Sequence, residues 1–147
     1  MLKINIICVG KIKEKYLKDL ISDYVLRINK YHKLEIIEVK DHEDIKKETD
    51  ELLKYLSDKS YNIALTIDGK NYSSEDLASH IDNLFNYNSL ITFIVGGSNG
   101  LEREIIDKCN ERLSFSSFTF PHGLFRGILL EQIYRSFKIN NNERYHK

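Results

Sequence analysis

Three glycines within five residues form the first pattern that could do chemistry. The sequence Gly-Gly-Ser-Asn-Gly at residues 96–100 directly follows an apolar run at residues 90–95. Glycine lets the backbone adopt a positive φ or approach a ligand closely. The turn lacks the spacing of a dinucleotide-binding fingerprint and the lysine of a phosphate-binding loop. It therefore indicates either a ligand-contacting turn or a tight strand-to-helix connection, and spacing alone favours neither.

A second group of candidates begins at Pro121. Proline favours the first turn of a helix, so His122 would lie where backbone N–H groups are unpaired. Arg126 follows four residues later, one turn along the same face. This spacing suits polar contacts to a ligand. Glu131 and Arg135 are also four residues apart, and an ordinary ion pair on the helix surface is the simpler interpretation for them.

The end of the chain is a third candidate. It reads Arg-Tyr-His-Lys at residues 144–147, after an asparagine run at residues 140–142. Terminal residues are commonly frayed. An aromatic ring, a histidine and two cations are nevertheless the side chains that hold a single-stranded nucleotide by stacking and hydrogen bonding. The tail is therefore a candidate RNA contact.

Alternating strands and helices must position these residues. Apolar runs and a segment rich in Ser, Thr and Phe predict strands at residues 4–9, 34–39, 62–67, 90–95 and 113–120. Helical spacing of apolar residues predicts helices at residues 14–28, 43–56, 73–85, 101–112 and 121–138. This alternation predicts an α/β fold with a mostly parallel sheet flanked by helices.

Ligands of such sheets bind beyond the carboxyl ends of the strands. Those ends lie at the Asp68-Gly69 turn, at the glycine turn of residues 96–100 and in the loop before Pro121. The final helix is apolar around most of its circumference. One side can face the sheet, and a second subunit is the simplest cover for the rest, so we expect a homodimer.

Length and charge narrow the function further. The 147 residues contain no linker or repeat, so we expect one domain over residues 1–147. The 22 basic and 22 acidic residues cancel, which argues against holding nucleic acid by bulk charge. An RNA partner must meet a local patch or a surface shared between subunits. Lys11, Lys13 and Lys15 could make such a patch, although simple solvation is the commoner state of such lysines.

The composition also indicates where the protein works. Cys8 and Cys109 make no metal or disulfide pattern, which fits a reducing cytoplasm. We expect no signal peptide, membrane span or metal site. Paired carboxylates, a Cys/His arrangement and a nucleophile elbow are all missing from the sequence, so hydrolase chemistry has no visible centre.

Several motifs taken together resemble the RlmH family, the bacterial SPOUT-class enzymes that methylate N3 of a pseudouridine in large-subunit ribosomal RNA. The matching stretches are residues 9–16, 65–70, 95–101, 113–116, 119–122, 126, 130–135 and 145–147. They occur in the family's order from end to end of the chain. Two departures lie in the tail, where Arg144 precedes Tyr145 and a glycine found in some members is missing.

The resemblance implies a SPOUT-type fold with a C-terminal trefoil knot, an obligate homodimer, and S-adenosylmethionine as methyl donor without a metal. It implies a target in the helix 69 loop of 23S ribosomal RNA on the assembled 70S ribosome. By position it assigns the donor contacts to Ile67, Gly96, Phe115, Ser116, Ser117, Phe118, Thr119 and Phe120. It assigns the substrate side, with the catalytic role, to His122, Arg126, Arg135, Tyr145 and His146.

Chemistry gives this assignment independent support. Methyl transfer needs in-line approach of a nucleophile, so positioning carries most of the work. The N3 imide of a uracil-type base must lose a proton first, and nearby arginines and a neutral histidine suit that step. Two alternatives stay open: a SPOUT enzyme acting on another RNA such as tRNA, and a non-catalytic dimeric module that binds a nucleotide or RNA.

Overall fold

The computed structural model describes residues 2–146. Met1 and Lys147, the last residue of the predicted tail motif, lie outside the described residues. In chain order the elements are β1 (Lys3–Val9), α1 (Lys15–Ile28), β2 (Lys33–Val39), α2 (Ile45–Leu53), β3 (Tyr61–Asn71), α3 (Ser74–Phe85), β4 (Leu90–Val95), α4 (Arg103–Asp107), β5 (Glu111–Ser114) and α5 (His122–Asn140).

The strands form one sheet in the order β2-β1-β4-β3-β5, and every neighbouring pair is parallel. β1 and β4 occupy the interior of the sheet, which explains why both read as nearly continuous apolar runs. The predicted α/β fold with a mostly parallel sheet is confirmed. The trefoil knot stays a prediction.

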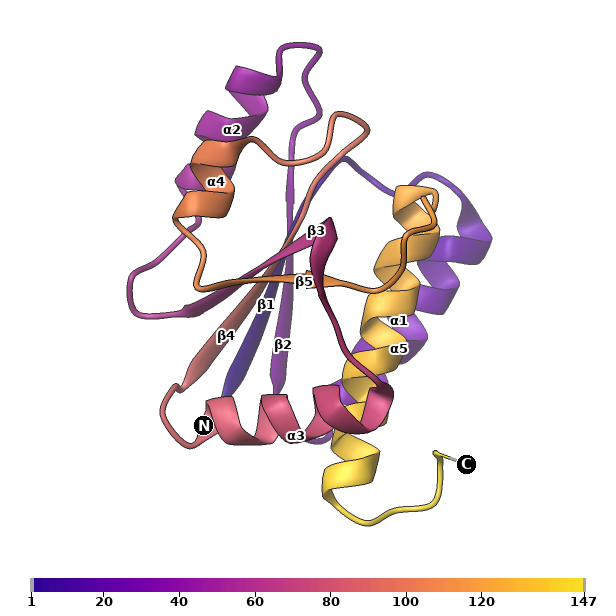
Figure 1. Ribbon diagram of the computed structural model, residues 1–147. Coiled ribbons are helices and arrows are strands. Elements are labelled where there is room, and N and C mark those ends of the chain that lie inside the picture. Colours follow the sequence, from indigo (N-terminus) through magenta and orange to yellow (C-terminus); the bar gives the residue numbers. More distant parts are fainter. Residues whose placement is uncertain (1, 147) are drawn as a thin grey trace.

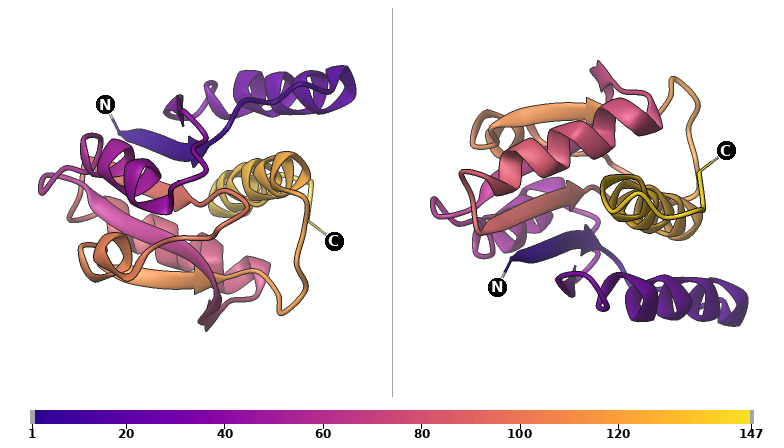
Figure 2. Two further views of the ribbon diagram at one scale, coloured as in Figure 1. Left: turned by 90° about the horizontal axis from the view of Figure 1, so that it is seen from above. Right: turned by 90° about the horizontal axis from the view of Figure 1, so that it is seen from below.

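Helices cover both faces of this sheet. Alternate residues of the strands, such as Ile4, Ile6 and Phe93, pack beneath α1, α3 and α5. The intervening residues, such as Ile7 and Ile94, pack beneath α2 and α4. Figure 1 shows α2 beside α4 on one side of the sheet and α1 beside α5 on the other, and Figure 2 shows the same layers from above and below.

Most of the apolar surface of α5 is buried by helices of the same chain, whereas the sequence analysis expected a second subunit to bury part of it. Leu129, Leu130, Ile133 and Phe137 are all buried, and the helices packed against α5 are α1 and α3 of the same chain. The apolar circumference of α5 therefore does not by itself require a second subunit. The homodimer remains a prediction that needs other support.

Several predicted elements are shorter than expected, among them the helix predicted at residues 43–56, which is α2 (Ile45–Leu53). The fifth strand spans Glu111–Ser114, so only two of the eight residues predicted for it, 113 and 114, are in the strand, and residues 115–120 form a loop. Serine explains the difference, because the Ser116 hydroxyl accepts the Phe118 N–H at 2.9 Å and makes a local turn that competes with strand pairing. The predicted helix at residues 101–112 contains only α4.

β3 is longer than predicted, because Asp68-Gly69 does not end it. The strand continues to Asn71 through a register shift, in which Leu65 and Lys70 both pair with Leu113 of β5. A Cβ on Gly69 would lie 2.7 Å from the Arg112 carbonyl carbon, so only glycine fits this approach. Residues 66–69 are left outside the ladder as a bulge.

Candidate functional site

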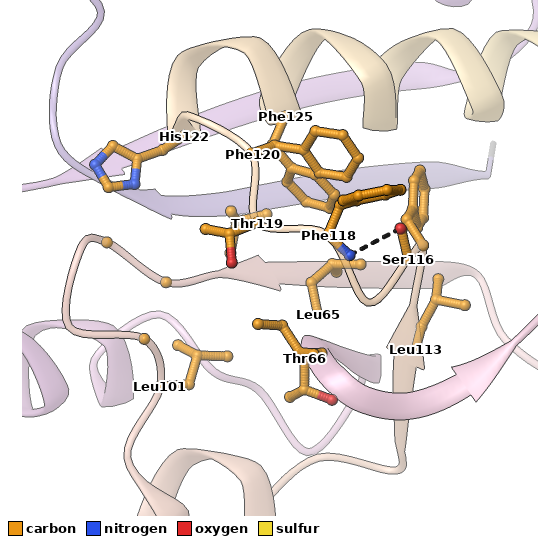
Figure 3. Close-up of a pocket in the computed structure, with 16 residues that line it drawn as sticks. Leu65, Thr66, Leu101, Leu113, Ser116, Phe118, Thr119, Phe120, His122 and Phe125 are labelled. Atoms are coloured by element: carbon orange, nitrogen blue, oxygen red, sulfur yellow. Dashed lines mark hydrogen bonds between the residues drawn. The ribbon is translucent and has the colours of Figure 1, made fainter.

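Three segments surround one small cavity, which we call the strand-end pocket because two of them follow the carboxyl ends of β4 and β5, while the third lies within β3. They are the start of the β3 bulge, the glycine turn after β4 and residues 115–120 after β5. Figure 3 shows side chains from these segments around a common space. The parallel sheet thus brings together segments that are far apart in the sequence.

Seven of the eight predicted donor-contact residues line this pocket: Ile67, Gly96, Phe115, Ser116, Phe118, Thr119 and Phe120. Ser117, the eighth, is not among the lining residues. The convergence of these segments is established, and their contact with a methyl donor remains a prediction.

The glycine turn has a tightly closed backbone. The Gly100 N–H donates to the Gly97 carbonyl at 3.0 Å, and Gly100 has a φ of +71°. A Cβ on Gly96 would lie 2.7 Å from the Gly100 carbonyl carbon and oxygen. The glycines are therefore needed for geometry, as expected of a tight strand-to-helix connection. They also line the pocket, and their contact with a ligand stays a prediction.

Aromatic rings and one unsatisfied hydroxyl give the pocket its chemical character. Phe125 packs edge-on against Phe115 and stacks with Phe120, with centroid separations of 5.2 and 6.1 Å. The Thr66 hydroxyl is buried without a hydrogen-bond partner among the described residues. Such a group favours a ligand that supplies the missing partner. The wall therefore suits a planar, largely apolar ligand with polar edges.

The lining residues that the sequence analysis did not assign to the site include Thr66, Leu101 and Phe125. Thr66 lies next to Ile67 in a stretch that matched the family, and Leu101 directly follows the glycine turn, so proximity to the motifs could have identified both. Phe125 gave no such signal, because a phenylalanine on an apolar helix is indistinguishable from a core residue.

The pocket must enlarge to admit a nucleoside-sized ligand. Its volume is about 160 Å³, whereas small-molecule sites usually measure roughly 300–1,000 Å³. Residues 115–120 are the adaptable wall, because they lie outside the sheet and Phe118 is 78% exposed. We therefore expect this loop to move outward when a ligand enters.

His122 lies between the strand-end pocket and a larger cavity. It is the first residue of α5, its side chain is exposed, and it lines both spaces. Figure 3 shows its ring pointing away from the phenylalanine rings. A group bound in either cavity can therefore contact His122.

Arg126 is buried one turn further along α5, with 2% of its surface exposed. Its Nη1 donates to the Glu38 carboxylate at 2.7 Å, and its Nη2 donates to the Gly10 carbonyl at 3.2 Å. Its Nε has no hydrogen-bond partner among the described residues. Arg126 therefore ties α5 to the ends of β1 and β2.

Arg135, Tyr145 and His146 form a separate cluster at the other end of α5. Arg135 donates to the Glu131 carboxylate at 2.9 Å, and the Tyr145 hydroxyl donates to the same carboxylate at 2.7 Å. His146 bonds Arg135 at 3.0 Å and also pairs with Glu75. Burial, with hydrogen bonding to Glu131, raises the pKa of the Tyr145 phenol above its usual range.

The tail is folded back along α5 instead of being frayed. Asn142 adopts a φ of 55°, a left-handed conformation that asparagine tolerates better than most residues. The Glu143 N–H then donates to the Lys138 carbonyl at 2.9 Å and closes the turn. An asparagine thus makes the reversal of the tail.

The five predicted substrate-side residues therefore lie in two places. His122 and Arg126 lie beside the cavities, whereas Arg135 lies 13 residues along α5 from His122, which corresponds to about 20 Å at 1.5 Å per residue. Tyr145 and His146 contact Arg135 and share its position. One protomer does not bring all five together.

The described residues show no other obvious centre for chemistry. No group of three His, Cys, Asp or Glu side chains within residues 2–146 could hold a metal ion. Burial raises the pKa of the Cys8 thiol to about 11, so it is an inert core residue at neutral pH. Among the described helices, none is both long and apolar enough to cross a membrane.

Comparison with known proteins places this geometry in a class. The family model described as "Predicted SPOUT methyltransferase" matches residues 2–146, so the fold is that of a SPOUT methyltransferase. Relatives named "Ribosomal RNA large subunit methyltransferase H" include those of Fusobacterium nucleatum and Clostridioides difficile, which are 48% and 50% identical to this chain. Each alignment covers 99% of this chain and 100% of the relative. The chain therefore belongs to the ribosomal RNA large subunit methyltransferase H family of SPOUT methyltransferases.

Proposed function

We propose that the protein uses S-adenosylmethionine to methylate N3 of a pseudouridine in the helix 69 loop of 23S ribosomal RNA. We further propose that it acts as a homodimer on the assembled 70S ribosome, in the cytoplasm. The names of its relatives support the choice of large-subunit ribosomal RNA. The observation that carries the proposal is the meeting of three strand-end segments, with His122, at one pocket.

The strand-end pocket is the proposed site of the methyl donor. When bound, S-adenosylmethionine supplies an electrophilic methyl group. The aromatic wall of Phe115, Phe120 and Phe125 suits its planar base, and the unsatisfied Thr66 hydroxyl suits a polar edge. The glycine turn contributes backbone that a side chain would otherwise cover.

His122 is the proposed link between donor and base. The N3 imide must lose its proton before it can attack, and His122 is exposed beside the pocket where that atom would approach. Arg126 holds the N-terminal turns of α5 against the ends of β1 and β2, so its proposed role is to position His122. Positioning is the main resource for a transfer that needs in-line geometry.

A second subunit would complete the site. Arg135 lies about 20 Å from His122 along α5, and Tyr145 and His146 contact Arg135, so this cluster does not reach the His122 of its own protomer without a large change. A neighbouring copy could bring this cluster to the pocket. A stacking ring, a histidine and a guanidinium would then hold a flipped-out base, and the chain's neutral charge would be compatible with a local basic site.

Methyl transfer to defined RNAs tests this proposal. The protein is incubated with labelled S-adenosylmethionine and 70S ribosomes, free 50S subunits or tRNA, and the labelled nucleoside is identified after digestion. We expect N3-methylated pseudouridine in 23S RNA, with 70S ribosomes as the best substrate. Label found only in tRNA would favour another SPOUT specificity. Donor binding without transfer to any RNA would favour the non-catalytic alternative.

A further inference from the structure

A larger cavity lies next to the strand-end pocket and has no role in the function proposed so far. It measures about 840 Å³ and is formed by the ends of β1 and β2, the loop into α1 and the first turns of α5. We call it the lysine groove, after Lys11, Lys13 and Lys40 in its wall. His122 lines both cavities, so the groove continues from the place where the base would react.

The groove gathers cations that have no partner. Lys11, Lys13 and Lys40 are exposed, and the described residues contain no ion pair to any of them. Lys15, the third lysine of the predicted patch, pairs instead with Asp19 at 2.8 Å and does not line the groove. In a chain without net charge, unpaired lysines along one cavity are a local source of affinity for phosphate.

Carboxylates also line the groove, but one of them is already neutralised. Glu38 pairs with Arg126 at 2.7 Å, whereas Glu14 and Asp41 remain beside the lysines. Arg126 is a buried, fixed cation in the groove wall, and its Nε lacks an acceptor among the described residues. An unsatisfied buried donor of this kind favours an acceptor-rich ligand.

An exposed aromatic ring completes the set. Tyr16, in the first turn of α1, lines the groove and is 72% exposed. Cations along a groove, together with an aromatic face, are the features that hold single-stranded nucleic acid through its phosphates and bases.

We propose that the lysine groove binds the single-stranded RNA next to the target nucleotide, with phosphates at Lys11, Lys13 and Lys40 and one base stacked on Tyr16. This inference rests on the proposed RNA substrate. It adds a path for the RNA strand on the same protomer that holds the donor. This path is separate from that protomer's own C-terminal cluster of Arg135, Tyr145 and His146.

The test replaces the three lysines together, as Lys11→Gln, Lys13→Gln and Lys40→Gln. The matched control, Lys46→Gln, Lys47→Gln and Lys59→Gln, removes the same charge from exposed lysines away from the groove. Binding of a helix 69 hairpin RNA, methyl transfer to 70S ribosomes, donor affinity and dimer mass are measured for each protein.

We expect the groove variant to bind RNA at least about tenfold more weakly, which is about 1.4 kcal/mol, with donor affinity and dimer mass unchanged. Three lost phosphate contacts should also reduce the slope of log affinity against log salt by about 2. Tyr16→Ala should weaken RNA binding without changing this slope. The control is Tyr87→Ala, at a ring 84% exposed and outside the groove, which should leave both RNA binding and the slope unchanged.

The outcomes separate the two proposals. RNA binding equal to that of the control variant would overturn the groove assignment, even if the wild-type protein methylates ribosomes. Loss of the dimer in the groove variant would overturn it too, and would assign the groove to a subunit contact. A wild-type protein that binds the hairpin through the groove but transfers no methyl group would contradict the proposed function alone.

Discussion

Glu48 is a carboxylate that the fold buries directly behind the glycine turn. Its side chain is 2% exposed, one oxygen accepts the His42 N–H at 3.1 Å, and the other has no partner among the described residues. That second oxygen would lie 3.8 Å from a Cβ on Gly97. Burial, reinforced by the nearby Asp41 carboxylate, raises the pKa of Glu48 above its usual value despite the hydrogen bond from His42.

This shift predicts a pH-dependent stability. Below pH 4.5, the ordinary pKa of a glutamate, Glu48 is mostly protonated in both states. As the pH rises, the unfolded chain releases this proton first, so the folded state loses stability until the pH passes the raised pKa. Glu48→Gln should remove this loss, which urea unfolding at a series of pH values would measure.

The control for this measurement is Asp50→Asn, an exposed acid on the same helix. The stability of Asp50→Asn should still fall as the pH rises, as expected for the wild-type protein. If wild type and Glu48→Gln declined equally as the pH rose, the burial of a proton-binding Glu48 behind the turn would be contradicted.

The glycine turn makes a second prediction at the residue scale. Gly96→Ala places a methyl group 2.7 Å from the Gly100 backbone, so the turn must open. We expect S-adenosylmethionine to bind at least about tenfold more weakly by calorimetry, a loss of ~1.4 kcal/mol. Ser98→Ala, at an exposed side chain of the same turn, should bind normally. Unchanged binding by Gly96→Ala would place the donor elsewhere.

At the scale of elements, the buried strands were predictable from the sequence, whereas the backbone conformation of the segments that line the pocket was not. β1 and β4 are interior strands whose apolar runs have no competing interpretation. Residues 115–120 alternate like a strand, but the Ser116 hydroxyl diverts the backbone into a turn. The β3 bulge is set by its approach to β5 at Gly69, a tertiary contact that no local pattern reveals.

The site itself was predictable only through several motifs taken together. Spacing left the glycine turn undecided, and it described Glu131 and Arg135 correctly as an ion pair, at 2.9 Å. The resemblance to a family located seven of the residues that line the strand-end pocket. The separation of His122 and Arg135 was not drawn from the sequence, although the predicted helix at residues 121–138 already places the two residues 13 positions apart along one axis.

The tail is an element whose removal should separate donor binding from transfer. A chain that ends at Arg144 lacks Tyr145 and His146, which contact Glu131 and Glu75, and neither of these carboxylates lines the strand-end pocket. We expect methyl transfer to 70S ribosomes to fall at least about 100-fold, or ~2.7 kcal/mol, while donor affinity stays within about twofold. Loss of donor binding in this truncated protein would contradict the proposed division of roles.

At the scale of the whole molecule, the proposed shared site can be tested by mixing two defective proteins. Gly96→Ala keeps its tail but has a weakened donor site, whereas the truncated chain keeps its donor site and lacks a tail. If subunits exchange freely, half of the dimers are mixed and each has one complete site. The mixture should then regain about a quarter of wild-type activity.

The controls are each variant alone at the same total concentration, with S-adenosylmethionine well below its wild-type Kd, where each should have about a tenth of wild-type activity or less. Exchange would be verified by mass spectrometry of the mixed dimers. Mixed dimers without recovered activity would show that the tail does not complete the site of a neighbouring subunit.

The bulge in β3 has a consequence for how the pocket can evolve. Residues 66–69 leave the β3–β5 ladder, so the strand pairing that normally occupies main-chain N–H and C=O groups is interrupted beside the cavity. Recognition there can be carried by peptide groups, which every amino acid shares. Substitutions at exposed Ile67 should therefore be tolerated widely, whereas inserting or deleting one residue between Leu65 and Lys70 would shift the whole hydrogen-bonding surface.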